Sequence, residues 1–217
     1  MLPEGSSDAV AIKICGLTTP GDAAACARLG VWGIGLIFAA GSPRRVDVPT
    51  AVAVARGVPA SVARVGVFVD ASSRAMADVA ARVGLTHIQI HGDTDPEEVR
   101  RMSGLPVIQG ISIDGAAAVA RARASAADLV LLDAAVAGLH GGTGTTFDWS
   151  LLEEDALGRP FALAGGLRPE NVAGAVARLR PVLVDVSSGV ETSPGRKDPE
   201  RVRAFADAVR GVGRRAA

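Results

Sequence analysis

Two side chains capable of acid–base chemistry follow short apolar segments that lie far apart in the chain. Cys15 comes directly after the segment 10–14, and Asp133 comes directly after the segment 129–132. An ionised thiol is a base, and a protonated carboxyl group is an acid. The pair therefore predicts general acid–base catalysis, provided that the fold brings both groups to one pocket.

Two loops of small residues follow the last two apolar segments of the chain. The first loop contains Gly165-Gly166, and the second contains Ser187-Ser188-Gly189. Small side chains leave backbone N–H groups accessible, which suits a phosphate group. The same residue types are also typical of ordinary turns, so the sequence leaves both interpretations open.

Each candidate side chain also has a purely structural interpretation. Cys15 is compatible with packing in the core, and Asp133 with capping a loop. Arg44 and Arg45, after the second apolar segment, are consistent with an exposed pair, and His91, after the fourth, with a polar residue at the rim of the fold. A functional interpretation is favoured because all of these candidates follow apolar segments and would share one face of a suitable fold.

The apolar segments recur at regular intervals and are separated by alanine-rich segments. Most of them are apolar throughout rather than alternating, which is the pattern of parallel strands covered on both faces. The predicted strands are 10–14, 32–38, 64–69, 87–90, 107–111, 129–132, 161–163 and 182–186. The predicted helices are 21–29, 50–57, 72–83, 96–102, 115–123, 170–179 and 199–209.

The alternation of strand and helix predicts an α/β protein with a single-domain TIM (β/α)8 barrel at 10–212 and flexible termini at 1–9 and 213–217. A doubly wound open sheet is the alternative, but it usually carries fewer strands in a chain of 217 residues. In a TIM barrel the C-terminal ends of all strands meet at one face, where active sites lie. The barrel would therefore gather the candidates around one pocket. The glycine-rich connection 138–149 is too long for us to expect only a linker.

Composition argues against several kinds of partner. The formal net charge is zero and no block of basic residues occurs, which argues against nucleic acid and against a membrane surface. No apolar stretch approaches the roughly 20 residues of a membrane span, and the start of the chain lacks the features of a signal peptide. Cys15 and Cys26 make no disulfide framework and favour a reducing compartment, the cytoplasm. Because no His, Cys or Asp cluster has the spacing of metal ligands, we expect no metal.

The segments that carry these candidates resemble the phosphoribosylanthranilate isomerases of tryptophan biosynthesis. The matching motifs are Lys13-Ile-Cys-Gly-Leu-Thr18, Ser42-Pro-Arg44, Ile88-Gln-Ile-His-Gly92, Leu131-Leu-Asp133, Gly141-Gly-Thr-Gly144, Leu163-Ala-Gly-Gly-Leu167 and Val184-Asp-Val-Ser-Ser-Gly-Val-Glu191. Several of these motifs are common singly, but their combination in this order is specific. The resemblance covers nearly the whole chain after the first nine residues.

The resemblance implies a TIM barrel that catalyses an Amadori rearrangement without a cofactor. The implied substrate is N-(5-phosphoribosyl)anthranilate, a small phosphorylated molecule, and the product is 1-(2-carboxyphenylamino)-1-deoxyribulose 5-phosphate. We expect the protein to be a monomer or a homodimer. By the same resemblance, Cys15 matches the general base, Asp133 matches the general acid, and Arg44 faces the anthranilate carboxylate. The phosphate site is expected at Gly165, Gly166, Ser187, Ser188 and Gly189.

This chemistry requires opposite protonation states of the two reactive groups. Cys15 must be ionised, so we expect either a lowered thiol pKa or activation by substrate binding. Asp133 must hold a proton, so its pKa should be raised by burial or by the substrate. One departure from the family is Thr145, where many members carry lysine or another long polar residue, and we expect it to affect the mobility of its loop.

Two alternative functions remain open at this level. A related sugar isomerase of histidine biosynthesis also performs Amadori chemistry, but those barrels usually carry aspartate after the first strand and bind two phosphates. Cys15 and the Ser42-Pro-Arg44 motif argue against that alternative. A catalytically inactive barrel, kept for binding, is the second alternative, and the intact pair of Cys15 and Asp133 argues against it.

Overall fold

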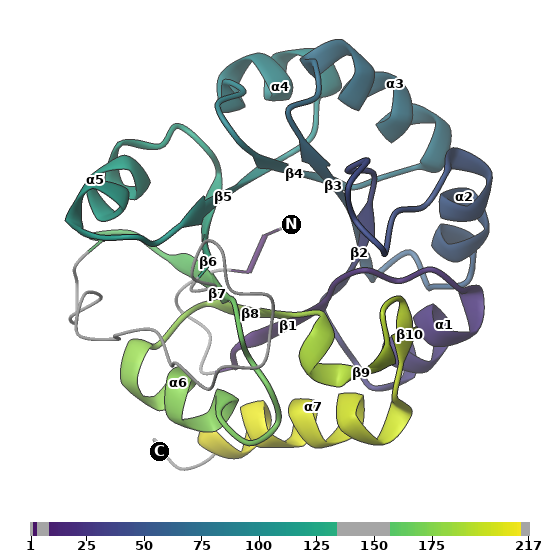
Figure 1. Ribbon diagram of the computed structural model, residues 1–217, viewed down its shortest axis with the longest axis vertical. Helices are drawn as coiled ribbons and strands as arrows, with labels where there is room; N and C mark the ends of the chain where they lie inside the picture. Colours follow the sequence, from purple (N-terminus) through teal and green to yellow (C-terminus); the bar gives the residue numbers. More distant parts are fainter. Residues whose placement is uncertain (1, 4–8, 134–156, 214–217) are drawn as a thin grey trace.

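The centre of the molecule is a closed barrel of eight parallel strands, seen end-on in Figure 1. The computed structural model describes residues 2–3, 9–133 and 157–213. The strands are β1 (Ala11–Ile14), β2 (Gly33–Ile37), β3 (Ala63–Val69), β4 (His87–His91), β5 (Val107–Ser112), β6 (Leu129–Asp133), β7 (Phe161–Ala164) and β8 (Leu183–Val186). They pair in chain order, and β1 closes the ring by pairing with β8. The predicted TIM (β/α)8 barrel is confirmed, and the open-sheet alternative is wrong.

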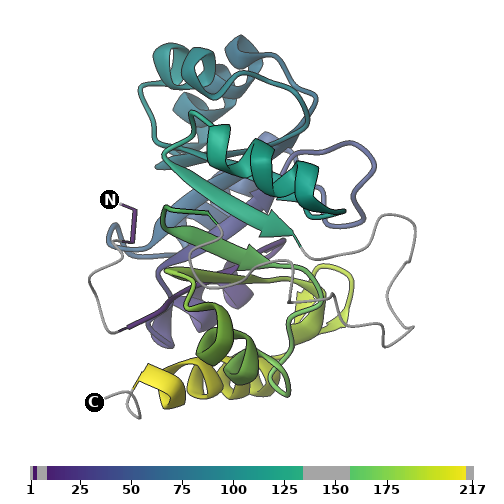
Figure 2. The same ribbon diagram turned by 90° about the vertical axis from the view of Figure 1, so that its left-hand side faces the viewer.

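Helices surround the barrel on its outside, as Figures 1 and 2 show from two directions. They are α1 (Pro20–Arg28), α2 (Val48–Arg56), α3 (Ser73–Val83), α4 (Pro96–Ser103), α5 (Ala116–Ala124), α6 (Val172–Leu179) and α7 (Pro199–Gly213). Every predicted strand and helix is present and begins within two residues of its predicted start. The glycine-rich connection 138–149, with Thr145, lies outside the described residues.

Local signals in the sequence explain where several helices begin and end. Asp47 precedes α2, and its carboxylate accepts a hydrogen bond of 2.9 Å from the backbone N–H of Thr50. Asp95 caps α4 in the same way, with Pro96 as the first helical residue. Gly84 and Gly104 end α3 and α4 in the left-handed conformation, with φ of 73° and 68°. These are the capping residues that favour helix boundaries, so the chain specifies them locally.

The barrel interior changes character along its axis. An apolar cluster inside the ring packs against Leu2 and Trp32; its buried members are Ala63, Val65, Ile108, Leu129, Leu131, Ala162, Ala164 and Leu183. Nearer the C-terminal ends of the strands the buried interior positions are polar, at Lys13, Gln89 and Asp185. Buried polar groups require partners, so this polar layer marks the end of the barrel where function is expected.

One small element was not predicted from the sequence. After β8 a short 3-10 helix, η2 (Ser188–Val190), leads into an antiparallel hairpin of β9 (Glu191–Ser193) and β10 (Arg196–Lys197). Its strands are too short to show an alternating pattern in the sequence. Within the described part of the chain, none of the helices has the length and apolar character required to cross a membrane.

His87 lies at the opposite end of the barrel from the polar layer and is buried without full hydrogen bonding. Its ring is 2% exposed and stacks edge-on against Trp32, with 5.1 Å between ring centroids. Nδ1 lies 2.8 Å from the Thr86 hydroxyl, while Nε2 has no hydrogen-bond partner in the described part of the chain. A buried ring with one unpaired nitrogen favours the neutral form.

This burial predicts a loss of stability in mild acid. Burial lowers the pKa of His87 to about 4, whereas histidine in an unfolded chain titrates at roughly 6.5. Between these values the unfolded chain binds a proton that the folded chain does not, so the free energy of unfolding falls as pH falls, by about 1.4 kcal/mol per pH unit. Urea unfolding at pH 7 and at pH 4.5 should show a drop about 2 kcal/mol larger in the native chain than in His87→Gln. Equal drops in the two proteins would contradict this account.

Candidate active site

A cavity of about 270 Å³ opens at the C-terminal mouth of the barrel. Its walls combine the reactive side chains with the two small-residue loops. The lining residues are Cys15, Ile37, Val67, Gln89, His91, Leu131, Asp133, Ala164, Gly165, Gly166, Leu167, Asp185, Val186, Ser187 and Ser188. Cys15 and Asp133 therefore come from β1 and β6 to one cavity, as the barrel predicts, and their chemical roles stay predictions.

The position of Cys15 is fixed by its backbone and by the strand beside it. Its N–H donates to the carbonyl of Val186 at 2.8 Å, and its carbonyl accepts a hydrogen bond of 3.1 Å from the Ser187 hydroxyl. A Cβ built at Gly35 on β2 would lie 2.6 Å from Sγ of Cys15. The thiol thus fits at this position only because residue 35 is glycine, which has no side chain.

Beneath the thiol, Lys13 and Asp185 form a buried ion pair. Nζ of Lys13 lies 2.9 Å from Oδ1 of Asp185, and the two side chains are 0% and 8% exposed. Burial disfavours the ammonium, but Asp185 and Cys15 together outweigh burial, so the pKa of Lys13 is raised. Lys13 and Cys15 also influence each other's pKa electrostatically. A charged lysine therefore faces Cys15 from below.

The thiol itself is held in its neutral form when the cavity holds no substrate. Burial raises the pKa of Cys15, and the opposing charges of Lys13 and Lys197 do not reverse this rise. The sequence predicts either a lowered thiol pKa or activation by substrate binding. A lowered pKa in the free protein is wrong, because the thiol is desolvated while Asp185 offsets the nearby lysine.

Asp133 is the last residue of β6 and sits between two neighbouring strands. It is in register with Ser112 of β5 and Ala164 of β7, and its carbonyl accepts a hydrogen bond of 3.0 Å from Ile113. Its side chain is half-buried and lines the cavity. The backbone therefore fixes the carboxyl group at the mouth, which is the placement that an acid requires.

The two small-residue loops pack against each other beside the cavity. Gly165 and Gly166 have φ of 89° and 61°, which glycine adopts without strain. A Cβ at Gly189 would lie 2.0 Å from the carbonyl oxygen of Leu167, so only glycine allows the second loop to approach the first. Both loops line the cavity, through Gly165 to Leu167 and through Ser187 and Ser188, whereas Gly189 supports them from outside it.

Arg44 is bound to Glu191 and is not among the residues that line the cavity. Nε of Arg44 lies 2.9 Å and 3.0 Å from the two Glu191 oxygens, and Nη2 lies 2.6 Å from Oε2. Lys197 also contacts Glu191, at 2.6 Å from Oε1. The two cations outweigh the effect of burial and lower the pKa of Glu191. The stem of Arg44 crosses Gly16, where a Cβ would lie 2.6 Å from Cδ.

Several polar residues of this region were not assigned a role from the sequence. They are Lys13, Gln89, Asp185, Glu191 and Lys197. His91 was interpreted from the sequence as a rim residue, and in the structure it lines the cavity. A signal was present in the strands: Lys13 and Asp185 interrupt otherwise apolar segments at interior positions, and Gln89 lies between two isoleucines in β4. Glu191 and Lys197 carried no such signal, because the hairpin that holds them was not predicted.

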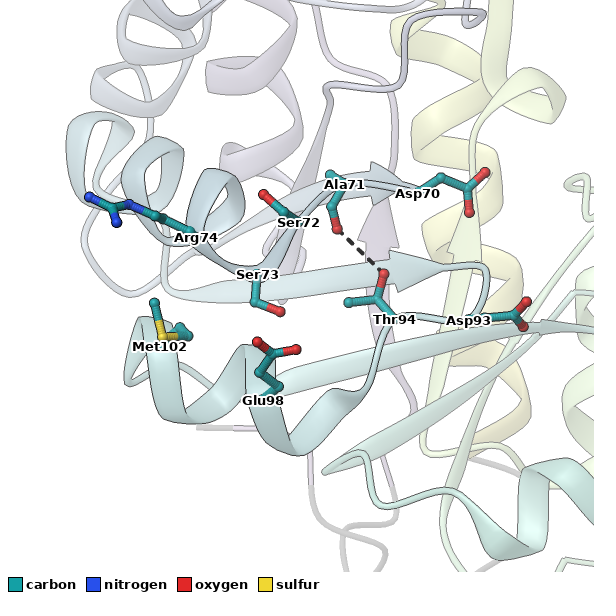
Figure 3. A pocket seen from close by; sticks show the side chains of 9 residues that line it. All are labelled: Asp70, Ala71, Ser72, Ser73, Arg74, Asp93, Thr94, Glu98 and Met102. Carbon is teal, nitrogen blue, oxygen red and sulfur yellow. Dashed lines mark hydrogen bonds between the residues drawn. The ribbon is translucent and has the colours of Figure 1, made fainter.

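A second hollow, of about 510 Å³, lies beyond β3 and β4 and beside α3 and α4 (Figure 3). Its walls carry Asp70, Asp93 and Glu98 but only one cation, Arg74. Figure 3 shows Asp70 and Asp93 at one end and Arg74 at the other, with the Thr94 hydroxyl donating to the Ala71 carbonyl at 3.4 Å. A predominantly acidic wall disfavours anionic ligands, so the smaller cavity inside the barrel is the better candidate site.

In the described residues no group of three or more His, Cys, Asp or Glu is arranged to hold a metal ion.

The fold and the cavity at its C-terminal mouth define a TIM-barrel enzyme. Residues 12–208 match the family model of N-(5'phosphoribosyl)anthranilate (PRA) isomerase. The chain is 48% identical over 207 residues to the N-(5'-phosphoribosyl)anthranilate isomerase of Pseudomonas aeruginosa (strain LESB58), covering 93% of this chain and 96% of that relative. It is 44% identical over 202 residues to the isomerase of Rubrobacter xylanophilus, covering 92% and 98%.

Solved structures agree with the sequence relatives. The phosphoribosyl anthranilate isomerase of Thermotoga maritima superposes with a TM-score of 0.84 at 36% identity, covering 93% of this chain and 99% of that one. A phosphoribosyl anthranilate isomerase in complex with reduced 1-(o-carboxyphenylamino)-1-deoxyribulose 5-phosphate superposes with a TM-score of 0.80 at 35% identity, with the same coverage. The chain therefore belongs to the PRA isomerase family, the isomerases of tryptophan biosynthesis.

The space at Gly35 generates a test of the thiol's position. Gly35→Ala would place a methyl group 2.6 Å from Sγ of Cys15 and 3.0 Å from its Cα, so Cys15 must move. Since small displacements at reacting groups cost about 100-fold, we expect kcat to fall by that order. Steady-state kinetics measure this fall, with Gly21→Ala as the control because a Cβ at Gly21 meets nothing within 4 Å. Unchanged kcat in a folded Gly35→Ala protein would show that the thiol's placement is not critical.

Proposed function

We propose that this chain converts N-(5-phosphoribosyl)anthranilate to 1-(2-carboxyphenylamino)-1-deoxyribulose 5-phosphate by an Amadori rearrangement, with Cys15 as general base and Asp133 as general acid. The observation that carries the proposal is that both side chains, from β1 and β6, line the same cavity of about 270 Å³. The reduced ligand bound to a relative of the same fold supports the substrate.

The proposed reaction moves protons between the substrate and these two groups. Asp133 donates a proton to the ring oxygen as the bond from that oxygen to C1′ breaks, which gives an open-chain Schiff base. The Cys15 thiolate removes the proton from C2′, which gives an enolamine. Cys15 then returns a proton to C1′ while Asp133 takes one from the oxygen on C2′, which gives the ketone. Cys15 ends as the thiolate and Asp133 as the protonated acid, the forms in which they began the proton transfers, so the isomerisation needs no further reactant.

The neutral resting thiol indicates how the base becomes active. Because burial raises the pKa of Cys15, we propose that the thiol releases its proton to solvent as the substrate binds rather than before binding. The raised pKa of Lys13 keeps an ammonium beside the thiol, so a buried positive charge would stabilise the thiolate as it forms. We expect the cytoplasm as the site of action, since this chemistry needs a reduced thiol.

Local groups must hold a substrate with two anionic ends, because the formal net charge of the chain is zero. We propose that the backbone of Gly165, Gly166, Ser187 and Ser188 binds the phosphate, with Gly189 shaping the loop. We propose that Arg44 meets the anthranilate carboxylate with the end of its guanidinium that Glu191 does not occupy. Holding both ends would fix the sugar between acid and base.

A monomer or a homodimer stays a prediction. A solved structure with a TM-score of 0.80 at 34% identity, covering 93% of this chain and 99% of that chain, contains monomers generated from the dimeric isomerase of Thermotoga maritima.

The proposed acid and base are tested by single substitutions. Cys15→Ser and Asp133→Asn should each lower kcat by about 10²- to 10⁴-fold, because each removes one proton-transfer step from the mechanism. Loss of substrate fluorescence measures kcat, and circular dichroism confirms folding. The control is Cys26→Ser, since Cys26 is 1% exposed in the core and lies outside the cavity. Near-normal kcat in folded Asp133→Asn would remove Asp133 as the acid, and an inactive native chain would favour the binding-only barrel.

The proposed contact of Arg44 predicts an effect on binding rather than on chemistry. Arg44→Ala should raise KM by about 10- to 100-fold with a smaller change in kcat, because a charge-assisted hydrogen bond to the substrate is lost. Steady-state kinetics separate the two constants. Arg45→Ala, at the exposed neighbouring position, is the matched control. An unchanged KM in Arg44→Ala would contradict the proposed contact between Arg44 and the substrate carboxylate.

A further inference from the structure

One buried polar atom in the cavity has no use in the mechanism above. Gln89, on β4, is 2% exposed and lines the cavity. Its side-chain oxygen Oε1 has no hydrogen-bond partner among the described residues. An unpaired buried acceptor is destabilising, and such atoms in native proteins call for an explanation. A ligand that donates a hydrogen bond to Oε1 of Gln89 would explain the unpaired atom.

His91 fixes the direction in which Gln89 points. The amide nitrogen of Gln89 lies 2.8 Å from Nε2 of His91, and an amide N–H donates, so Nε2 accepts. A ring nitrogen accepts only when it carries no proton, which is the neutral imidazole with its proton on Nδ1. Burial lowers the pKa of His91, against the opposing effects of Asp133 and Asp185 and together with that of Lys13, in agreement with a neutral ring. The amide nitrogen is thereby occupied, and Oε1 remains for another donor.

The neighbouring strand leaves room for this arrangement. Gly110 of β5 is in register with His91, and a Cβ built at Gly110 would lie 2.3 Å from Cε1 of the imidazole. The ring therefore fills the space of a missing side chain. Packing against Gly110 and the bond to Gln89 together hold the His91 ring in one orientation.

We propose that Gln89, oriented by His91, accepts a hydrogen bond from a ribose hydroxyl of the substrate. This inference rests on the proposed function, which supplies the ligand. The substrate's other hydrogen-bond donor, the anilino N–H, lies next to its own ortho carboxylate and bonds to it internally, which leaves the sugar hydroxyls as donors. Gln89 thus becomes a substrate-binding residue and His91 a positioning residue.

The placement of Gln89 around the barrel agrees with a contact to the sugar. The loops proposed for the phosphate follow β7 and β8, whereas β4 lies across the ring from β8 (Figure 1). Cys15 and Asp133, the groups proposed to act at C1′ and C2′, share the cavity with Gln89. A sugar that spans from the phosphate loops towards the acid and base would bring its hydroxyls to the far wall, where Gln89 lies.

Two ligands that differ only in their hydroxyl groups test the proposal. The first is reduced 1-(o-carboxyphenylamino)-1-deoxyribulose 5-phosphate, and the second is 5-(2-carboxyanilino)pentyl phosphate, which keeps both anions and the anilino N–H but has no hydroxyl. Calorimetry should show that Gln89→Leu weakens binding of the first about tenfold and changes binding of the second less than twofold. Gln109→Leu is the matched control, because Gln109 lies on β5 outside the cavity and accepts a hydrogen bond from Ser125 instead.

The role of His91 is tested in the same assay. His91→Ala should weaken binding of the hydroxylated ligand severalfold, and it should have no further effect in the Gln89→Leu background, because it acts through Gln89. A merely structural role would weaken both ligands alike. If Gln89→Leu does not fold, Gln89→Met keeps the length of the side chain and removes the acceptor.

Three results would overturn the proposal. Equal weakening of both ligands by Gln89→Leu would assign the contact to the anilino nitrogen or to packing, and unchanged binding of the hydroxylated ligand would remove the contact altogether. A native chain that binds neither ligand would overturn the proposed function itself, and this proposal with it. The first two results leave the proposed acid, base and phosphate site untouched, so the two failures are distinguishable.

Discussion

A buried ion pair at the seam of the barrel supports the whole site. Lys13 of β1 and Asp185 of β8 face each other where the first and last strands meet, in direct register. Neither charge is stable in the interior alone, and removing one partner of such a pair costs about 3–5 kcal/mol. The pair therefore links the two strands that close the ring, and it lies two residues before Cys15 on β1. A contact that joins the first and last strands is thus also a neighbour of the thiol.

The buried polar residues of the described barrel strands lie near the mouth, with the exception of His87 at the opposite end. Towards the opposite end, residues such as Val65, Ile108 and Leu129 fill the ring, as expected of a packed barrel core. Near the mouth each polar group is tied to another: Lys13 to Asp185, and Gln89 to His91. These ties give Lys13, Asp185 and the Gln89 amide nitrogen a partner, although Oε1 of Gln89 has none among the described residues, and they restrict the movement of the cavity walls.

The sequence predicted the frame of this protein because its signals are local. Continuous apolar strands, prolines and aspartates at helix starts, and glycines at helix ends each act within a few residues, and every predicted strand and helix is present. The meeting of Cys15 and Asp133 followed from the barrel, since all strands end at one mouth. The raised pKa of Cys15 could not be predicted, because it depends on burial and on charges brought from β8 and β10.

Contacts between distant segments were beyond the reach of sequence patterns. Arg44 and Glu191 are separated by 147 positions, and the hairpin that carries Lys197 has strands too short to predict. The orientation of the Gln89 amide could not be predicted from the sequence either, because it is set by His91 and by the space above Gly110. These features arise from packing between strands and loops that the chain brings together only after folding.

The clamp of Glu191 on Arg44 has a consequence for affinity. A long side chain that is free in solution loses rotational freedom when a ligand fixes it, at a cost of about 0.5–1.5 kcal/mol. Here that freedom is already lost on folding, since three contacts of 3.0 Å or less immobilise the guanidinium. At the proposed contact a substrate carboxylate would meet a rigid, oriented cation, because the entropy of ordering this side chain is lost when the protein folds rather than when the ligand binds.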